Sequence, residues 1–248
     1  MTPSKSLVKK ILLSSGTLLF LGYWQSGGLP TPNDLFSNVK NEPIQTITTK
    51  QPFTTQVGGI TYTIRPLYKY DLYGLVVSKH DADTWWDYIH REANDRLNVS
   101  DICVVWGKNA QNGSYLPIHF SNGQFTCYWK TNSSKDFAAF DQFSISNNHL
   151  LTDQATLANI ISHIKRGDQI HFSGYLAEYE HHEGFHFKRG TSTVRNDTGN
   201  HACETVFVEK IEILKRASSP WEKLFWLAAI LFITGCVMWF YTPVNDFE

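Results

Sequence analysis

The sequence predicts a mixed α+β fold that is mainly β, with one or two helices, flanked by hydrophobic segments near both chain ends. Three observations lead to this fold class. Short apolar or alternating runs recur between residues 59 and 216 with Gly and Asn between them, helical periodicity is confined to a few stretches, and Leu224–Tyr241 carries no charge. Aromatic residues make up 14 % of the 248 residues, which is enough for a packed core.

The C-terminal hydrophobic segment has the properties of a membrane span. At about 1.5 Å per helical residue, Leu224–Tyr241 covers roughly 27 Å, close to the ~30 Å core of a bilayer. Trp221 and Trp239 suit the two membrane interfaces. A buried globular helix is the alternative, although no polar face interrupts the run. We expect a transmembrane helix over residues 220–241 and a short acidic tail over 242–248.

The N-terminal segment has the anatomy of a signal sequence. Lys5, Lys9 and Lys10 precede the apolar stretch Ile11–Trp24, and no clear small-x-small cleavage site follows it. We expect residues 1–25 to be an uncleaved signal anchor, with a cleaved signal peptide as the alternative.

The lysines near the N-terminus place that end in the cytoplasm, whereas Lys215, Arg216 and Lys223 oppose this orientation at the second segment. Because the first segment usually dominates, we expect a protein of the bacterial inner membrane with its soluble domain in the periplasm and both termini cytoplasmic.

The expected organisation is a tether and extended lead-in over 26–58 and a soluble β-rich domain over 59–216. We expect a helix at 83–96 and strands at 60–66, 72–78, 102–106 and 125–129. In the C-terminal half, residues 153–165 have the apolar spacing of a helix, with Gly167 as its C-terminal cap. Strands are expected at 170–179 and 203–214, with a bulge near Glu209.

The passage from this helix into the next strand resembles a known fold. A lysine and an arginine lead into Gly167-Asp168, and a strand reading I-H-F-S-G-Y-L follows. This pattern resembles the helix-to-fourth-strand passage of OB-fold domains over about Asp153–Tyr179, together with the closing strand to Leu214. The resemblance implies an OB-like, partly open barrel. Single-stranded-DNA-binding proteins share the pattern, but a net charge of −1 makes nucleic acid an unlikely partner.

Three further motifs resemble a family of bacterial membrane-anchored proteins with one exported domain. They are Val105-Trp106-Gly107, Ser146–Leu151 and Arg195–Glu204. The resemblance implies export of the domain and carries no activity with it.

The polar stretch GTSTVRNDTGNHACE contains the candidate catalytic residues. Arg195, Asp197, Cys203 and Glu204 would converge in a site there, and Cys203 would be a nucleophile if His149, expected in a loop, lowered the pKa of its thiol. The alternative is a structural Asx-rich turn in which Cys203 is a small buried apolar residue.

The hairpin histidines are the candidate metal ligands. His181, His182 and His186, beside Glu183, offer imidazole and carboxylate groups suited to Zn or Cu. A solvated loop tip is the alternative, and we expect no cofactor.

Two further features concern the first half of the domain. Cys103 and Cys127 lie on neighbouring predicted strands, and in an oxidising compartment they could form a disulfide. Trp85, Trp86, Tyr88 and His90 form either an exposed patch for a partner or the face that docks their helix on the sheet, which we favour.

These observations favour a membrane-anchored, non-catalytic binding or assembly module of the cell envelope that recognises a protein or envelope ligand. The alternatives are a membrane-tethered hydrolase that uses Cys203 with His149, or Arg195, Asp197 and Glu204, and periplasmic metal handling by the hairpin histidines.

Overall fold

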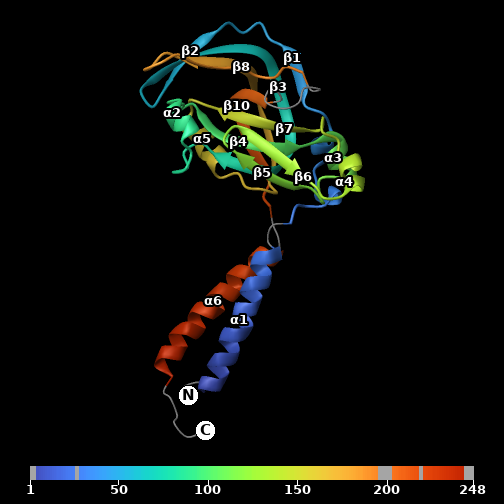
Figure 1. Cartoon of the computed structure of the whole chain (residues 1–248), viewed down its shortest axis with the longest axis vertical. Coiled ribbons are helices and arrows are strands. Elements are labelled where there is room, and N and C mark those ends of the chain that lie inside the picture. The colour runs from blue at the N-terminus through green and yellow to red at the C-terminus, as the bar shows by residue number, and fades with distance from the viewer. Residues whose placement is uncertain (1–3, 26–27, 195–202, 218–219, 243–248) are drawn as a thin grey trace. The chain divides into compact units, whose positions relative to one another are not determined.

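A computed structural model describes residues 4–25, 28–194, 203–217 and 220–242. The chain divides into two compact units. One comprises residues 1–28 and 218–248, and the other comprises residues 29–217. The second unit is a mixed α+β domain, mainly β, as the sequence predicts (Figure 1).

The first unit pairs two helices, α1 (Lys5–Gln25) and α6 (Pro220–Tyr241), which lie side by side (Figure 1). Small residues permit this approach, since a Cβ added at Gly22 would lie 3.0 Å from the Cα of Phe225. Among the described residues, α6 is the one helix long and apolar enough to cross a membrane. A span formed by α1 remains a prediction.

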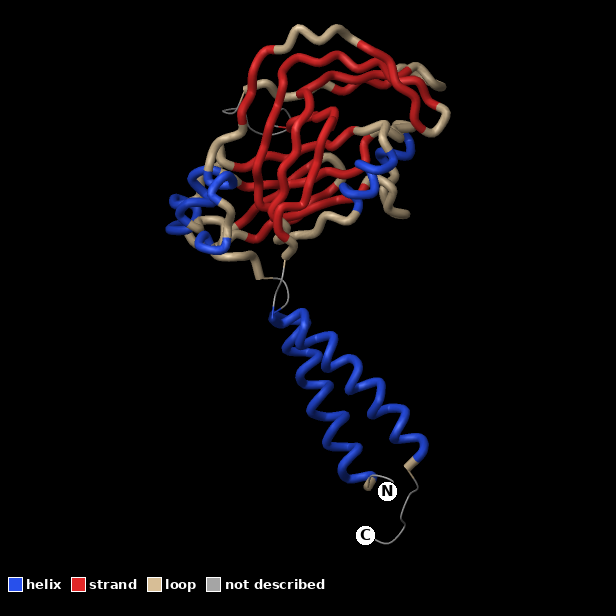
Figure 2. The backbone as a smooth tube through the Cα atoms, turned by 180° about the vertical axis from the view of Figure 1, so that it is seen from behind, coloured by secondary structure: helices blue, strands red, loops and turns tan. Residues whose placement is uncertain are grey.

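Eight strands of the second unit form a large sheet. They are β1 (Ile44–Ile47), β2 (Phe53–Val57), β3 (Ile60–Asp81), β4 (Asn98–Val105), β7 (Ile145–Leu151), β8 (Gln169–His181), β9 (Phe187–Arg189) and β10 (Cys203–Lys215). The order is β1-β3-β4-β7-β10-β8-β9, and β2 pairs with β3. A further pairing of β3 with β8 closes a ring β3-β4-β7-β10-β8, in which β7 and β10 run parallel. Strands make up most of this unit (red in Figure 2).

The segment between β4 and β7 adds a separate hairpin of β5 (His119–Gly123) and β6 (Thr126–Lys130). The short helices are η1 (Pro32–Asp34), η2 (Ser37–Lys40), α2 (Ile89–Glu92), α3 (Gly107–Asn112), α4 (Ser134–Ala139) and α5 (Ala155–Ser162). The disulfide Cys103–Cys127 joins β6 to β4.

The main core lies inside the ring of strands. Leu72, Val104, Phe172 and Val206 are buried there, and α5 adds Ile161 from its apolar face. Burial of each such side chain stabilises the fold by roughly 1.5–3 kcal/mol. The helical periodicity of residues 153–165 therefore predicts the correct face, although α5 itself ends at Ser162.

The two long strands β8 and β10 confirm the clearest sequence predictions. Their register shifts between Val208 and Lys210, where the alternation of apolar residues changes phase, so the predicted bulge near Glu209 is present. Val206, Val208 and Ile211 are buried on its two sides.

Several other strands and loops differ from the sequence prediction. The strands expected at 60–66 and 72–78 are one strand, β3, with an irregularity between Pro66 and Tyr68. The lead-in expected over 26–58 contains β1 and β2, because both pair with β3 and so belong to the compact unit. Residues 146–151, expected as a loop, form β7, since their polar side chains have hydrogen-bond partners inside the domain.

The helix expected at 83–96 is only the short α2. The residues expected to dock this helix on the sheet divide: Trp85 is 85 % exposed and Tyr88 is exposed as well, whereas the half-exposed Trp86 packs on His80 of β3 and His90 is buried. Buried hydrogen bonds of Asp87 and His90 hold the segment instead, which is why apolar periodicity does not describe it.

Candidate functional site

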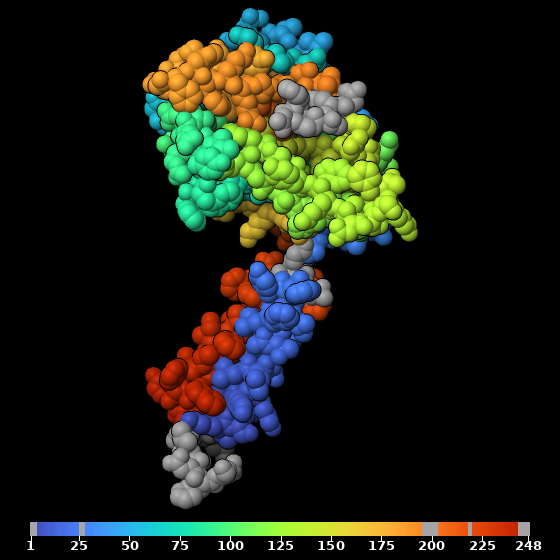
Figure 3. Space-filling view, viewed as in Figure 1, coloured from blue at the N-terminus to red at the C-terminus, as the bar shows by residue number. Residues whose placement is uncertain are grey.

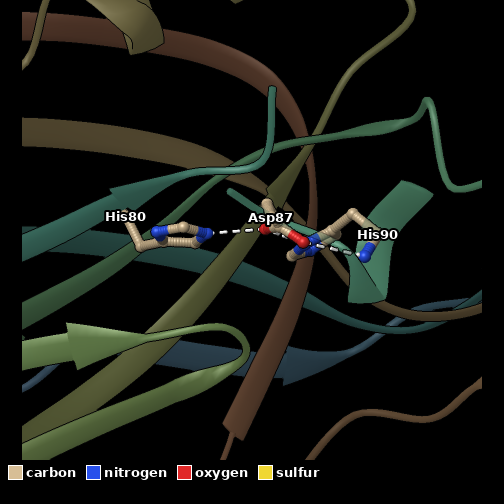
Figure 4. Close-up of side chains that lie close together, drawn as sticks. All are labelled: His80, Asp87 and His90. Atoms are coloured by element: carbon tan, nitrogen blue, oxygen red, sulfur yellow. Dashed lines mark hydrogen bonds and ion pairs between the residues drawn. The ribbon is translucent and has the colours of Figure 1, made fainter. Parts of the chain in front are cut away.

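Two imidazoles meet on one carboxylate oxygen in the interior of the β domain. The Oδ2 atom of Asp87 lies 2.6 Å from Nε2 of His80 and 2.6 Å from Nδ1 of His90 (Figure 4). All three side chains are buried. Burial opposes ionisation of Asp87, but hydrogen bonds from both histidines lower its pKa below the usual value.

Local structure places these three residues. His80 is near the end of β3, and a turn in which the N–H of Asp87 donates to the carbonyl of Thr84 leads into α2, which carries His90. The second oxygen of Asp87, Oδ1, accepts the backbone N–H of His90 at 2.9 Å. The carboxylate therefore fixes both the histidine rings and the start of the helix.

The polar contacts continue from His90 to the strands of the ring. Asn98 Nδ2 lies 2.8 Å from His90 Nε2 and donates to Asp101 Oδ1 at 2.9 Å. The other amide atom, Asn98 Oδ1, is buried and has no hydrogen-bond partner among the described residues. Because swapping the two amide atoms would leave the other one without a partner, this side chain has unused hydrogen-bonding capacity beside His90.

A buried pair of Asp101 and His149 lies beyond Asn98. His149 Nδ1 is 2.5 Å from Asp101 Oδ1, and His149 Nε2 is 2.6 Å from Arg189 Nη2. Arginine only donates hydrogen bonds, so Nε2 carries the lone pair and Nδ1 carries the proton. Burial lowers the pKa of His149, although Asp101 opposes the shift, and the ring is neutral. Burial favours the neutral form of Asp101, but its contacts with His149 hold the pKa of this carboxyl well below its usual range.

Phe125, at the tip of the β5–β6 hairpin, covers these groups. Its ring centroid lies 3.9 Å from that of His90, and the guanidinium carbon of Arg189 is 3.8 Å from the Phe125 ring. Its backbone N–H donates to Asp101 Oδ2 at 2.7 Å. Phe125 has a left-handed backbone with φ of 63°, which a bulky residue rarely adopts, so its neighbours must hold it there.

The structure places His149 and Cys203 on adjacent strands without joining them. Cys203 opens β10 opposite Asn147, and its Sγ atom is near Asn147 Nδ2 at 3.8 Å and near the Phe125 carbonyl at 3.7 Å. Both ring nitrogens of His149 have other partners. Burial also raises the pKa of the Cys203 thiol, which disfavours the thiolate that a nucleophile needs.

The remaining candidate catalytic residues are only partly located. Glu204 follows Cys203 in β10 and is largely buried opposite Asn148. Arg195 and Asp197 lie outside the described residues.

The hairpin histidines separate into two environments. His181 is buried, and its Nε2 atom lies 2.9 Å from the carbonyl oxygen of Ala93. His182 and His186 are exposed at the tip, and the carboxylate of Glu180, rather than the ring of His181, lies beside them.

Sequence patterns do not reveal most of this site. His80, Asp87 and His90 match no ligand spacing, because a turn rather than a regular helix brings them together. The one usable signal is Asp101, a carboxylate directly before the apolar run of β4. A charged residue in a buried strand requires a partner.

Two chemistries are open to the His80–Asp87–His90 group. It can act as a hydrogen-bonded clamp for α2, or its three donor atoms, which lie within 4.8 Å of one another, can hold a metal ion. Two imidazoles and one carboxylate are a common ligand set for zinc and other transition metals. No family model, curated protein or solved structure matches the chain, so the geometry carries the functional argument.

Proposed function

We propose that this protein is a membrane-anchored, non-catalytic binding module of the cell envelope whose β domain holds a divalent transition-metal ion. His80, Asp87 and His90 are the ligands. The observation that carries the proposal is the convergence of Nε2, Oδ2 and Nδ1 of these buried residues within 4.8 Å of one another.

Metal binding requires a small rearrangement of this group. The nitrogens now share the Asp87 oxygen through hydrogen bonds of 2.6 Å. To present lone pairs there, each neutral ring would have to carry its proton on the other ring nitrogen, and the carboxylate would move back so that all three ligands reach the ion at about 2.0–2.2 Å.

The topology supports a binding role. We infer that the ring β3-β4-β7-β10-β8 is an OB-like, partly open barrel, with α5 between its third and fourth strands. Ligands of OB folds lie on the second and third strands and the loops after strands one and four. Except for His80, which lies near the end of β3, the polar groups of the site come from these places: β4, β7, the segment between β3 and β4, and the segment between β8 and β10.

The contacts favour binding over the hydrolase alternative. A base for Cys203 would need a free lone pair on His149, but Nε2 of that ring accepts from Arg189. The raised pKa of Cys203 points in the same direction.

Metal titration of the full-length protein, purified without a histidine tag, tests the proposal. The wild type is expected to bind one buried Zn²⁺ or Mn²⁺ per chain, and Asp87→Asn and His80→Gln should each lose that equivalent. His119→Gln, which changes an exposed histidine of β5, is the matched control. If Asp87→Asn binds as much metal as the control, the group is only a structural clamp.

We propose a protein partner in the envelope for the exposed aromatic residues beside this site. The Trp86 ring lies 4.7 Å from the ring of His80, so a partner bound to Trp85 and Trp86 would also meet the metal site. A photo-crosslinking amino acid at position 85 should give a defined adduct in cells, and the same probe at exposed Phe137 should not. Equal labelling at the two positions would exclude Trp85 and Trp86 as a specific partner-binding surface.

We also propose export of the domain to the periplasm from the inner membrane, with both termini in the cytoplasm and α6 as an anchor. The disulfide Cys103–Cys127 supports an oxidising compartment. Alkaline phosphatase fused after Lys215 should be active; an inactive fusion would place the domain in the cytoplasm.

A further inference from the structure

A second set of metal-ligating side chains lies at the tip of the β8–β9 hairpin. Glu180, His182 and His186 bring one carboxylate oxygen and two imidazole nitrogens within 4.8 Å of one another. In contrast to the buried group, His182 and His186 are exposed. Figure 3 shows this hairpin (orange) directly beside the segment that carries α2 (green).

The backbone of the hairpin brings these residues together. Glu180 is in β8, and His182 directly follows the last residue of that strand, His181. Gly184, with φ of +80°, turns the chain back so that His186 returns to them. A residue with a Cβ would be strained at that turn.

The three side chains already lie close together. His186 Nε2 lies 3.1 Å from Glu180 Oε2, and the rings of His182 and His186 stack at 4.5 Å with 9° between their planes. An imidazole nitrogen that carries no proton offers the lone pair that a metal ion needs.

The base of the hairpin is rigid enough to hold this geometry. His181, which lies between Glu180 and His182 in the chain, is buried, bonds to the carbonyl of Ala93, and stacks on Phe187 at 5.2 Å. Phe187 is its register partner on β9. The tip is therefore attached to two paired strands whose side chains are packed.

We propose that Glu180, His182 and His186 form a second, solvent-exposed site for a borderline divalent ion, Cu²⁺ or Zn²⁺. Two imidazoles and one carboxylate leave coordination positions for water, so the ion exchanges with solution. The site is independent of the buried group, since the two share no residue.

Titration of full-length, tag-free protein with Cu²⁺ alone, followed by electron paramagnetic resonance, tests the inference. The double variant His182→Gln/His186→Gln should bind one Cu²⁺ fewer than the wild type and lose a signal with nitrogen hyperfine structure. Glu180→Gln should lower the Cu²⁺ affinity of this site by about tenfold. Loss of a residue that only supports a metal ligand lowers metal affinity by about 10–100-fold, so tenfold is a low expectation for a direct ligand. His119→Gln should change neither quantity.

The outcomes separate the two sites. All three side chains lie at or near the surface, so the variants should have the metal-free melting temperature of the wild type. If the buried group binds no metal, the wild type still binds one Cu²⁺ and the double variant binds none. Equal Cu²⁺ stoichiometry in the double variant and the wild type would overturn the proposed surface site. That result would leave the proposal for the buried group unaffected.

Discussion

The ring of Phe125 covers the ring of His90, with 3.9 Å between their centroids. Phe125 belongs to the β5–β6 hairpin, whereas His90 belongs to α2, so the inserted hairpin closes the candidate metal site. The Gln124 side chain donates to the carbonyl of Trp86 at 3.2 Å and ties the same tip to the segment before α2.

Removal of this cover should speed metal exchange. Phe125→Gly deletes the ring and also suits the left-handed backbone at this position, so the hairpin can keep its turn. Transfer of bound Zn²⁺ to a chelator should become faster in this variant. Phe137→Ala, which shortens an exposed aromatic residue of α4, should leave the rate unchanged. An unchanged rate in Phe125→Gly would show that metal reaches the site by another path.

The disulfide should stabilise the domain measurably. It closes a loop with a sequence separation of 24 residues. In the chain-entropy model, such a loop contributes about 3 kcal/mol to the free energy of unfolding. Cys103→Ala/Cys127→Ala should therefore have a lower urea midpoint than the wild type, measured by tryptophan fluorescence. Thiol titration of the unfolded wild type should give Cys203 and Cys236 before reduction and all four cysteines afterwards. Four thiols without reductant would contradict the bridge.

His149 should make the metal-free domain less stable in mild acid. Burial lowers its pKa in the folded state, although Asp101 partly offsets this effect and Arg189 and His90 add to it. The unfolded chain therefore binds the proton more readily, and stability is complete above the unfolded pKa of about 6.5 and falls as the pH drops below it. Urea midpoints in EDTA between pH 7.5 and 5 should fall less steeply for His149→Gln than for the wild type. Identical slopes would refute a neutral buried His149.

Cys203 should be a slow nucleophile in the folded protein. Burial raises the pKa of its thiol, and the reactive form is the thiolate. Peptide mapping after iodoacetamide treatment at neutral pH should show much slower modification of Cys203 in the native protein than in urea. Rapid native labelling would restore the thiol hydrolase as the better hypothesis.

Helices and strands are predicted best where the periodic apolar residues of the sequence are also the residues that are buried in the fold. In β10 the residues Val206, Val208 and Ile211 alternate in two phases, and this local pattern locates both the strand and its bulge. The opposite holds for β7, in which Asn148 and His149 are fully buried. The polar residues of this segment suggest a loop when the sequence is considered alone, because the groups that bind their side chains lie on other strands.

The site is harder to predict for the same reason. The donor atoms of His80 and His90 converge through a turn, and the rest of the network joins Asp101 on β4 to Arg189 on β9. Pairings between distant segments create these contacts, and no residue spacing encodes them. His149 and Cys203 could be singled out as polar candidates, but their partners could not.

Zinc K-edge X-ray absorption of the zinc-loaded His182→Gln/His186→Gln protein distinguishes a buried metal site from a structural clamp, because this variant removes the surface ligands and keeps His80, Asp87 and His90. We expect one zinc ion per chain with two imidazole nitrogens and one carboxylate oxygen at about 2.0–2.2 Å, lost in the further variant Asp87→Asn. A protein that retains no zinc, or a spectrum without imidazole scattering, would contradict this expectation.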